Sequence, residues 1–248
     1  MSRLIVISNR VALPDETAPG GLASGLRAAL RDEGGIWFGW SGEISEHCTL
    51  THRQEGTTEF VLTDLTAEEH ERYYLGFSNR TLWPLFHYRP SLLDYSRHDF
   101  MGYWAVNERF ARLLAPLLRP DDVIWVHDYH LIPLARELRA LGVTARIGFF
   151  LHVPLPPSSL LALLPHHELL FPSWMEYDVI GTQTAADAEA LQSYLLRYAH
   201  ADLDGDNHLR GTDGNICHIG VFPIGIDAQT SRRRQRKRWS RMRYASWM

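Results

Sequence analysis

"DVIWVHDYHLIPLARELRALGVTARIGFFLHV", residues 122–153, is the stretch that decides the fold. It begins with a short apolar run of strand length, "DVIWVH", and it ends with another, "ARIGFFLHV". Between them "LIPLARELRALG" has the apolar spacing of a helix. A strand, a helix and a second strand in this order predict a right-handed crossover that joins two parallel strands.

The same alternation extends toward the N-terminus. "RLIVIS" (3–8) is a continuous apolar run, which is typical of a strand buried on both faces of a parallel sheet. Residues 21–35 have helical spacing, and 35–40 and 59–65 are predicted strands. "TAEE" has the Thr-x-x-Glu form of a capping box, so the mostly helical region predicted over 66–118 begins there.

Toward the C-terminus the pattern continues with a helix in "PSSLLALLP", a strand in "YDVIGTQT", a helix in "AADAEALQSYLLRYA" and a strand in "CHIGVFPIG". The predicted fold class is therefore α/β, with a doubly wound, mostly parallel, Rossmann-like sheet that helices cover on both faces. No Pro/Gly/Ser-rich linker divides residues 1–229, so we expect one domain there.

Composition sets outer limits on the class of protein. The chain has 248 residues, of which 45% are hydrophobic and 22% charged, and this excludes a disordered or collagen-like protein. No apolar run approaches the roughly 20 residues of a membrane span, and "MSRLIVISNR" is too short for a signal sequence, so a cytoplasmic protein is expected. Cys48 and Cys217 lie far apart without metal-type spacing, which favours two reduced thiols.

Charge is distributed unevenly. Residues 230–248 hold eight Lys or Arg and no acid, whereas the other 229 residues carry 17 bases against 29 acids. The body therefore has a formal charge of −12 and the tail +8. The tail is expected to be disordered. Its charge would attract any phosphate backbone, but Trp239 and Trp247 form no known recognition element, so nucleic-acid binding is the weaker interpretation.

Polar side chains follow four of the predicted strands. They are Asn9 and Arg10, then His127, Asp128, Tyr129 and His130, then His152, and finally Gln183 and Thr184. Ligands of open α/β sheets bind outside the carboxyl ends of the strands, so we expect these side chains to share one rim.

Several of these positions have two interpretations. His127 and His130 are three apart and lack a nearby cysteine or carboxylate pair, which disfavours a metal site. Asp128 could cap the following helix or accept hydrogen bonds from sugar hydroxyls. Gly20 and Gly21 could form a plain loop or could expose backbone N–H groups to a phosphate at a helix N-terminus.

The aromatic residues at 37–83 are open to two interpretations as well. Trp37, Trp40, Tyr73, Tyr74 and Trp83 are dense for this length. They could form platforms for a sugar ring or pack in the core, and their spacing does not decide between the two.

Eight motifs, in order, carry a resemblance to a known family. They are "RLIVISNRVALP", the Gly-Gly loop, "GGIWFGWSGE", "YYLGFSNRTLWPLFHY", "VIWVHDYHLIPLARELR", "RIGFFLHVPLPPSS", "YDVIGTQT" and "VFPIGID". Over residues 1 to about 228 the chain resembles the N-terminal domain of the trehalose-6-phosphate synthase family. The resemblance implies the N-terminal half of a GT-B glycosyltransferase. It also implies retaining transfer of glucose from UDP-glucose to glucose 6-phosphate, giving trehalose 6-phosphate and UDP.

The resemblance also implies roles for particular residues. Arg10 is similar to the family's phosphate-binding arginine, whose guanidinium fork suits a phosphate dianion. The glucose 6-phosphate pocket matches Arg10, Trp40, Tyr74, Trp83 and Asp128, the donor side matches Gly20, Gly21 and His152, and Asp128 and His152 match the catalytic positions. No cofactor or metal is expected, because cationic side chains neutralise the leaving diphosphate. The expected partners are the two small-molecule substrates and no membrane, and the family also allows a homo-oligomer.

The end of the chain departs from the family pattern. The family's diphosphate-binding and donor-binding residues belong to a C-terminal domain, which we expect to be absent, with the aberrant basic tail 230–248 in its place. The interpretations are a reading-frame change near residue 230 or a genuine short protein with a basic tail. We expect this chain alone to be inactive. The alternative function is a non-catalytic sugar-phosphate-binding module, or a half-enzyme that needs a separate C-terminal domain.

Overall fold

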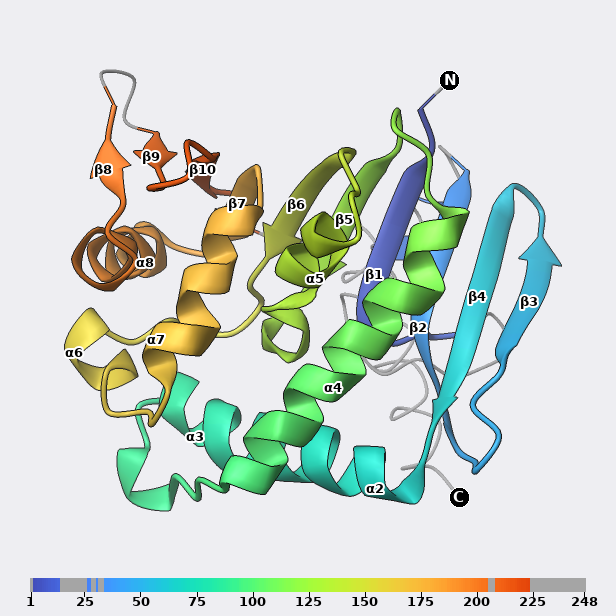
Figure 1. Cartoon of the computed structure of the whole chain (residues 1–248), viewed down its shortest axis with the longest axis horizontal. Helices are drawn as coiled ribbons and strands as arrows, with labels where there is room; N and C mark the ends of the chain where they lie inside the picture. The colour runs from blue at the N-terminus through green and yellow to red at the C-terminus, as the bar shows by residue number, and fades with distance from the viewer. Residues whose placement is uncertain (1, 14–25, 28–29, 31–33, 205–207, 224–248) are drawn as a thin grey trace, which may run out of the picture.

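A computed structural model describes residues 2–13, 26–27, 30, 34–204 and 208–223 (Figure 1). The strands of these residues form one sheet in the order β3-β4-β2-β1-β5-β6-β7-β10-β9-β8. The strands are β1 (Leu4–Arg10), β2 (Gly35–Ile44), β3 (Leu50–Glu55), β4 (Thr58–Leu65), β5 (Val123–His127), β6 (Arg146–Phe150), β7 (Val179–Thr182), β8 (Asp202–Leu203), β9 (Leu209–Arg210) and β10 (Ile216–Val221).

Strand pairing confirms the predicted doubly wound, mostly parallel sheet. From β4 through β2, β1, β5, β6 and β7 to β10 every pair is parallel, and only β3, β8 and β9 add antiparallel pairs at the edges. The chain runs outward from β1 to β2 and β4, then returns to pair β5 with β1 and runs outward in the other direction. The strand order therefore reverses between β1 and β5, which is where open α/β sheets bind ligands.

Helices follow the predicted order with some breaks. They are α2 (Ala67–Glu69), the π-helix η1 (His70–Leu82), α3 (Trp83–Phe86), η2 (Pro90–Leu92), α4 (Arg97–Leu114), η3 (Ala115–Leu117), η4 (Tyr129–Leu131), α5 (Leu134–Ala140), α6 (Ser158–Leu161), α7 (His167–Leu170), η5 (Phe171–Glu176) and α8 (Ala185–Tyr198). The predicted capping box is confirmed at Thr66 and Glu69. The helix predicted in "LIPLARELRALG" is wrong in its first turn, because α5 begins only after Pro133, which lacks the N–H that a helix interior needs.

Two hydrophobic clusters cover the two faces of the sheet. Alternate residues of β1 divide between them: Ile5 and Ile7 pack with the cluster under α4 and α5, and Val6 packs on the opposite face with Leu26 and Leu30. Figure 1 looks onto the face that α4 and α5 cover. The helix predicted over 21–35 lies mostly outside the described residues. Of its described residues, 26, 27 and 30 are helical, whereas Gly35 already begins β2.

The prediction that both faces of the sheet are covered is confirmed for only part of the sheet. Over β5, β6 and β7 the described residues leave a groove of about 380 Å³ on the face opposite α5. The groove is lined by Trp125, Gly148, Phe149, Phe150, Val179, Gly181 and Phe222. No helix in the described ranges is both long and apolar enough to span a bilayer.

Candidate functional site

The candidate site lies at the carboxyl ends of β1 and β5, where the strand order reverses. Ile7 of β1 pairs with Val126 of β5, so the residues that follow them emerge next to each other. Asn9 in β1 accepts a hydrogen bond of 2.8 Å from the hydroxyl of Tyr73 on η1. This bond ties η1, a helix type that often occurs at functional sites, to the rim of the sheet.

Asp128 has an unusual backbone conformation. Its φ of 73° and ψ of 165° lie in a region that is essentially restricted to glycine and costs other residues about 1–3 kcal/mol. The carboxylate accepts hydrogen bonds from the backbone N–H of Tyr129 (3.1 Å) and of His152 (3.4 Å). The helix-cap interpretation of Asp128 is therefore correct for η4. The retained strain indicates a functional position as well, because a cap alone does not require it.

The Asp128 carboxyl also has an unusual environment. Burial raises its pKa to about 6, although the backbone hydrogen bonds from Tyr129 and His152 lower it. The residue is half-buried by exposed area, so its carboxyl is largely surrounded by protein while part of the residue reaches the surface. No ion pair joins this acid to a cation among the residues that the structure describes, and a buried, unpaired acid is unfavourable for stability, which again indicates a function.

A chain of aromatic rings lies around the η4 turn. Tyr74 on η1 lies 5.5 Å from Trp40 on β2 and stacks on His130 at 6.0 Å, measured between ring centroids. His130 stacks in turn on Tyr129 at 4.1 Å, and Tyr129 lies 6.0 Å from Trp83. The structure thus brings together the three predicted pocket aromatics Trp40, Tyr74 and Trp83 around the η4 turn that Asp128 caps.

The aromatic residues of 37–83 divide between the two predicted roles. Trp37 and Tyr73 are fully buried, so core packing is the correct interpretation for them. Trp40 is buried with its ring N–H donating to the carbonyl of Glu43 at 2.7 Å. Trp83 is 45% exposed, and such a ring is free to contact a ligand.

Arg10 lies against the backbone of Gly42. A Cβ atom placed on Gly42 would lie 2.7 Å from Nε of Arg10 and 2.9 Å from its Cζ, closer than real contacts allow. Gly42 has φ +98°, which also favours glycine. Gly42, in the irregular last part of β2, therefore leaves room for the guanidinium at the end of β1, and Arg10 itself is exposed.

His127 and His152 form a direct pair. Nδ1 of His127 lies 2.9 Å from Nε2 of His152. Burial lowers the pKa of His152 to about 4, that of His130 to about 3 and that of His127 well below its usual value, so all three imidazoles are neutral at pH 7. No group of three or more His, Cys, Asp or Glu in the described part of the chain could hold a metal ion.

The remaining predicted positions lie elsewhere or cannot be placed. Gly20, Gly21 and the predicted domain boundary after residue 229 lie outside the described residues. Thr184 caps α8 by accepting a hydrogen bond of 3.2 Å from the backbone N–H of Asp187, so it has a structural role.

Sequence reasoning missed His70 and Gly42. His70 packs 5.4 Å from Trp40 and 5.5 Å from Tyr74, and its spacing of four residues from Tyr74 could have revealed it. The contact between Gly42 and Arg10 had no signal in the sequence, because it joins the ends of two strands that are distant in the sequence.

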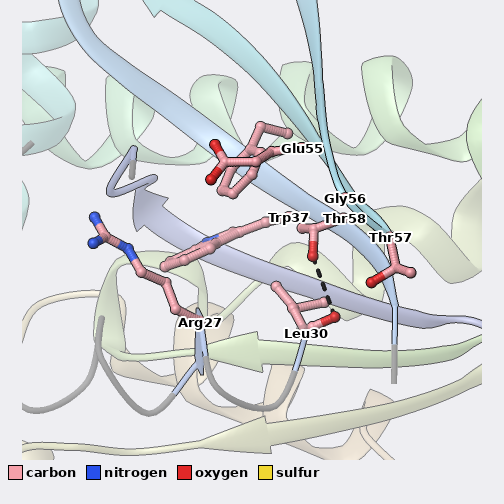
Figure 2. A pocket seen from close by; sticks show the side chains of 8 residues that line it. Arg27, Leu30, Trp37, Glu55, Gly56, Thr57 and Thr58 are labelled. Carbon is pink, nitrogen blue, oxygen red and sulfur yellow. Dashed lines mark hydrogen bonds between the residues drawn. The ribbon is translucent and has the colours of Figure 1, made fainter. Parts of the chain in front are cut away.

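A separate pocket of about 500 Å³ lies beside β2 and β4 (Figure 2). It is lined by Arg27, Leu30, Trp37, Glu55, Gly56, Thr57, Thr58 and Phe60. Thr58 begins β4 and donates a hydrogen bond of 3.2 Å to the carbonyl of Leu30, which Figure 2 shows as a dashed line. The pocket therefore lies toward the amino ends of the strands, whereas ligands of such sheets bind at the carboxyl ends.

Fold and site together define a class of protein. A doubly wound sheet with an arginine, a strained acid and aromatic rings at its switch point is a Rossmann-like ligand-binding domain. The model of glycosyltransferase family 20 matches residues 8–245, and the chain belongs to this family.

Known relatives agree with this assignment. The chain is 50% identical over 234 residues to trehalose-6-phosphate synthase of Sinorhizobium fredii (strain NBRC 101917 / NGR234), covering 92% of this chain and 50% of that protein. It also resembles the solved structure of the alpha,alpha-trehalose-phosphate synthase (UDP-forming) from Burkholderia xenovorans in complex with glucose-6-phosphate. The TM-score is 0.85 and the identity is 47%, over 91% of this chain and 50% of the other.

A third relative is also a solved structure. The structure described as "Trehalose-6-phosphate from E. coli bound with UDP-2-fluoro glucose" matches with a TM-score of 0.86 and 41% identity, over 92% of this chain and 50% of the other. The chain therefore spans about half the length of the relatives that it matches.

Proposed function

We propose that this chain supplies the acceptor side of a retaining, UDP-forming trehalose-6-phosphate synthase, which transfers glucose from UDP-glucose to glucose 6-phosphate. The observation that carries the proposal is the strained, buried Asp128 at the switch point of the sheet, beside a chain of aromatic rings. Two solved relatives of the same fold hold glucose-6-phosphate and UDP-2-fluoro glucose, which supports both substrates.

In this proposal Arg10 binds the phosphate of the acceptor. Its guanidinium offers a planar fork of N–H donors to phosphate oxygens, and the exposed position beside Gly42 leaves it accessible. The Asp128 carboxylate accepts hydrogen bonds from sugar hydroxyls. The Asp128 oxygens have lone pairs beyond those that Tyr129 and His152 use.

The aromatic rings shape the same pocket. Trp83 is exposed and Tyr74 is half-buried, so each can lie against the apolar face of a sugar ring. Gly20, Gly21 and His152 belong to the donor side. Positioning and charge stabilisation then supply most of the rate, with the leaving phosphate accepting the proton of the incoming hydroxyl and without a protein nucleophile.

Titration calorimetry on the chain tests acceptor binding. Glucose 6-phosphate is expected to bind to the native chain more tightly than glucose, and Arg10→Ala is expected to remove this difference. Arg112→Ala is the matched control. Arg112 is an exposed cation on α4 that forms an ion pair with Glu108, and both residues are distant from Arg10 in the sequence. Equal affinity of native and Arg10→Ala proteins for glucose 6-phosphate would show that the phosphate lies elsewhere.

Release of UDP tests the complete transfer. Because the chain spans about half of its relatives, the two outcomes have different meanings. UDP formation with both substrates would assign the full reaction to the chain. Specific binding of glucose 6-phosphate without UDP release would favour the alternative, a sugar-phosphate-binding module or a half-enzyme. Any turnover is expected to be unaffected by EDTA, because the proposal assigns no step to a metal or cofactor.

The proposal also includes a cytoplasmic location and leaves a homo-oligomer open. Cys48 and Cys217 are both free thiols, which is usual in a reducing compartment. Fractionation of cells and size-exclusion chromatography of the pure chain test these two points.

A further inference from the structure

His127 and His152 meet at the carboxyl edge of the sheet, one at the end of β5 and the other just after β6. Nδ1 of His127 lies 2.9 Å from Nε2 of His152, and the ring centroids are 5.2 Å apart. His127 is only 1% exposed. A hydrogen bond between two imidazole nitrogens needs one proton, so one ring donates and the other accepts.

Two arrangements of the protons are compatible with this contact. Both rings are neutral at pH 7 because burial lowers both pKa values, so each ring carries a single N–H. In the first arrangement His127 donates from Nδ1, and His152 keeps its own proton on Nδ1. In the second arrangement His152 donates from Nε2, and His127 keeps its proton on Nε2.

The surroundings of His127 favour the first arrangement. Nε2 of His127 is buried without a hydrogen-bond partner among the described residues. The second arrangement would place an unsatisfied N–H there, whereas the first leaves only an unused lone pair. Orphaned buried N–H groups are the rarer of the two in proteins. The adjacent Trp125 ring, 4.4 Å away between centroids, would offer such an N–H only a weak contact.

We propose that His127 is a positioning residue that holds His152 with its proton on Nδ1, so that His152 acts at this edge of the sheet as a hydrogen-bond donor to a sugar hydroxyl. In this tautomer Nε2 of His152 already accepts from His127, so His152 has no free lone pair and cannot act as a base. The sugar contact rests on the proposed function, but the tautomer does not.

Asp128 provides a second anchor for the same histidine. Its carboxylate accepts a hydrogen bond of 3.4 Å from the backbone N–H of His152. Two consecutive residues at the end of β5 therefore fix His152, Asp128 at its backbone and His127 at its ring. Such support around a site residue reduces the number of rotamers and tautomers that it can adopt.

Long-range ¹H–¹⁵N correlation spectra of the ¹⁵N-labelled chain at pH 7, without ligand, test the proposal. Signals are assigned with His152→Gln and with two variants of His127. The native chain is expected to show His152 with its proton on Nδ1. His127→Phe keeps a ring but removes the donor, so this signal of His152 is expected to be lost. His127→Asn has a side-chain N–H near the position of Nδ1 and is expected to preserve it.

Two results would overturn the proposal. One is a native His152 with its proton on Nε2, and the other is an unchanged His152 tautomer in His127→Phe. If His127→Phe does not fold, the native spectrum alone decides between the two arrangements. Because the spectra are recorded without ligand, failure of glucose 6-phosphate binding leaves this test intact, and failure of this test leaves the acceptor assignment intact.

Discussion

Replacing Asp128 with Asn is expected to stabilise the fold at neutral pH. The pKa of the folded Asp128 carboxyl is raised to about 6, above the ordinary value of 3.8 that it has in the unfolded chain. Its contribution to stability is therefore fully present below pH 3.8 and is lost as the pH rises through about 6. Asn is uncharged at every pH and keeps an oxygen that can accept the hydrogen bond from the backbone N–H of Tyr129.

The size of the effect follows from the shift of about two pKa units. At about 1.4 kcal/mol per unit, the charged carboxyl lowers the free energy of unfolding at pH 8 by up to about 3 kcal/mol. We treat this as an upper value, because the half-buried residue keeps some contact with solvent. Asp128→Asn should be more stable than the native chain by up to that amount at pH 8 and by little at pH 4.

Urea unfolding of both proteins between pH 4 and pH 8 measures this difference. His152 contributes in the opposite direction, because its folded pKa is lowered to about 4 and stability is lost as the pH falls toward that value. Both proteins contain His152, so its contribution cancels. Asp121→Asn is the control for removing one acid, because Asp121 is exposed and precedes β5, whereas Asp128 follows it. A difference for Asp128→Asn that does not grow between pH 4 and pH 8 would refute the reasoning.

Three further predictions concern the site and the fold. Gly42→Ala should weaken glucose 6-phosphate binding about tenfold or more in calorimetry, because its Cβ would displace Arg10; unchanged affinity would contradict this. Trp83→Ala should lower sugar affinity but reduce the free energy of unfolding by less than about 1 kcal/mol, because the ring is 45% exposed; thermal unfolding measures the second effect. Thr66→Ala should cost about 1 kcal/mol in urea unfolding by removing the capping box, whereas Thr51→Ala on exposed β3 should cost little.

The sequence predicted the parallel strands because each of them is a short apolar run. "VIWV" and "IGFF" are such runs, and both belong to central strands. β3 was missed because it is an edge strand whose residues, Leu50–Glu55, are nearly all exposed and polar, so no apolar pattern distinguishes it from a loop. The π-helical form of η1 could not be predicted either, since helix propensity does not distinguish a π-helix from an α-helix.

The location of the site was predictable, but its internal geometry was not. Strand topology alone placed Arg10, Asp128 and His152 at one rim. The stacking of Tyr74 on His130 and the pairing of His127 with His152 join segments that are distant in the sequence. Contacts of this kind depend on tertiary packing, which composition and spacing do not encode.

The glycine-like backbone of Asp128 has a consequence for evolution. Aspartate codons become glycine codons through a single A-to-G transition, and glycine would adopt this conformation without strain while removing a poorly solvated acid. A single-nucleotide change at this position would thus relieve the backbone strain and remove the buried acid. A lineage under selection for folding alone should lose the acid quickly, and a sequence-design procedure that optimises stability would make the same replacement. Aspartate at position 128 therefore persists only where something other than the fold selects it.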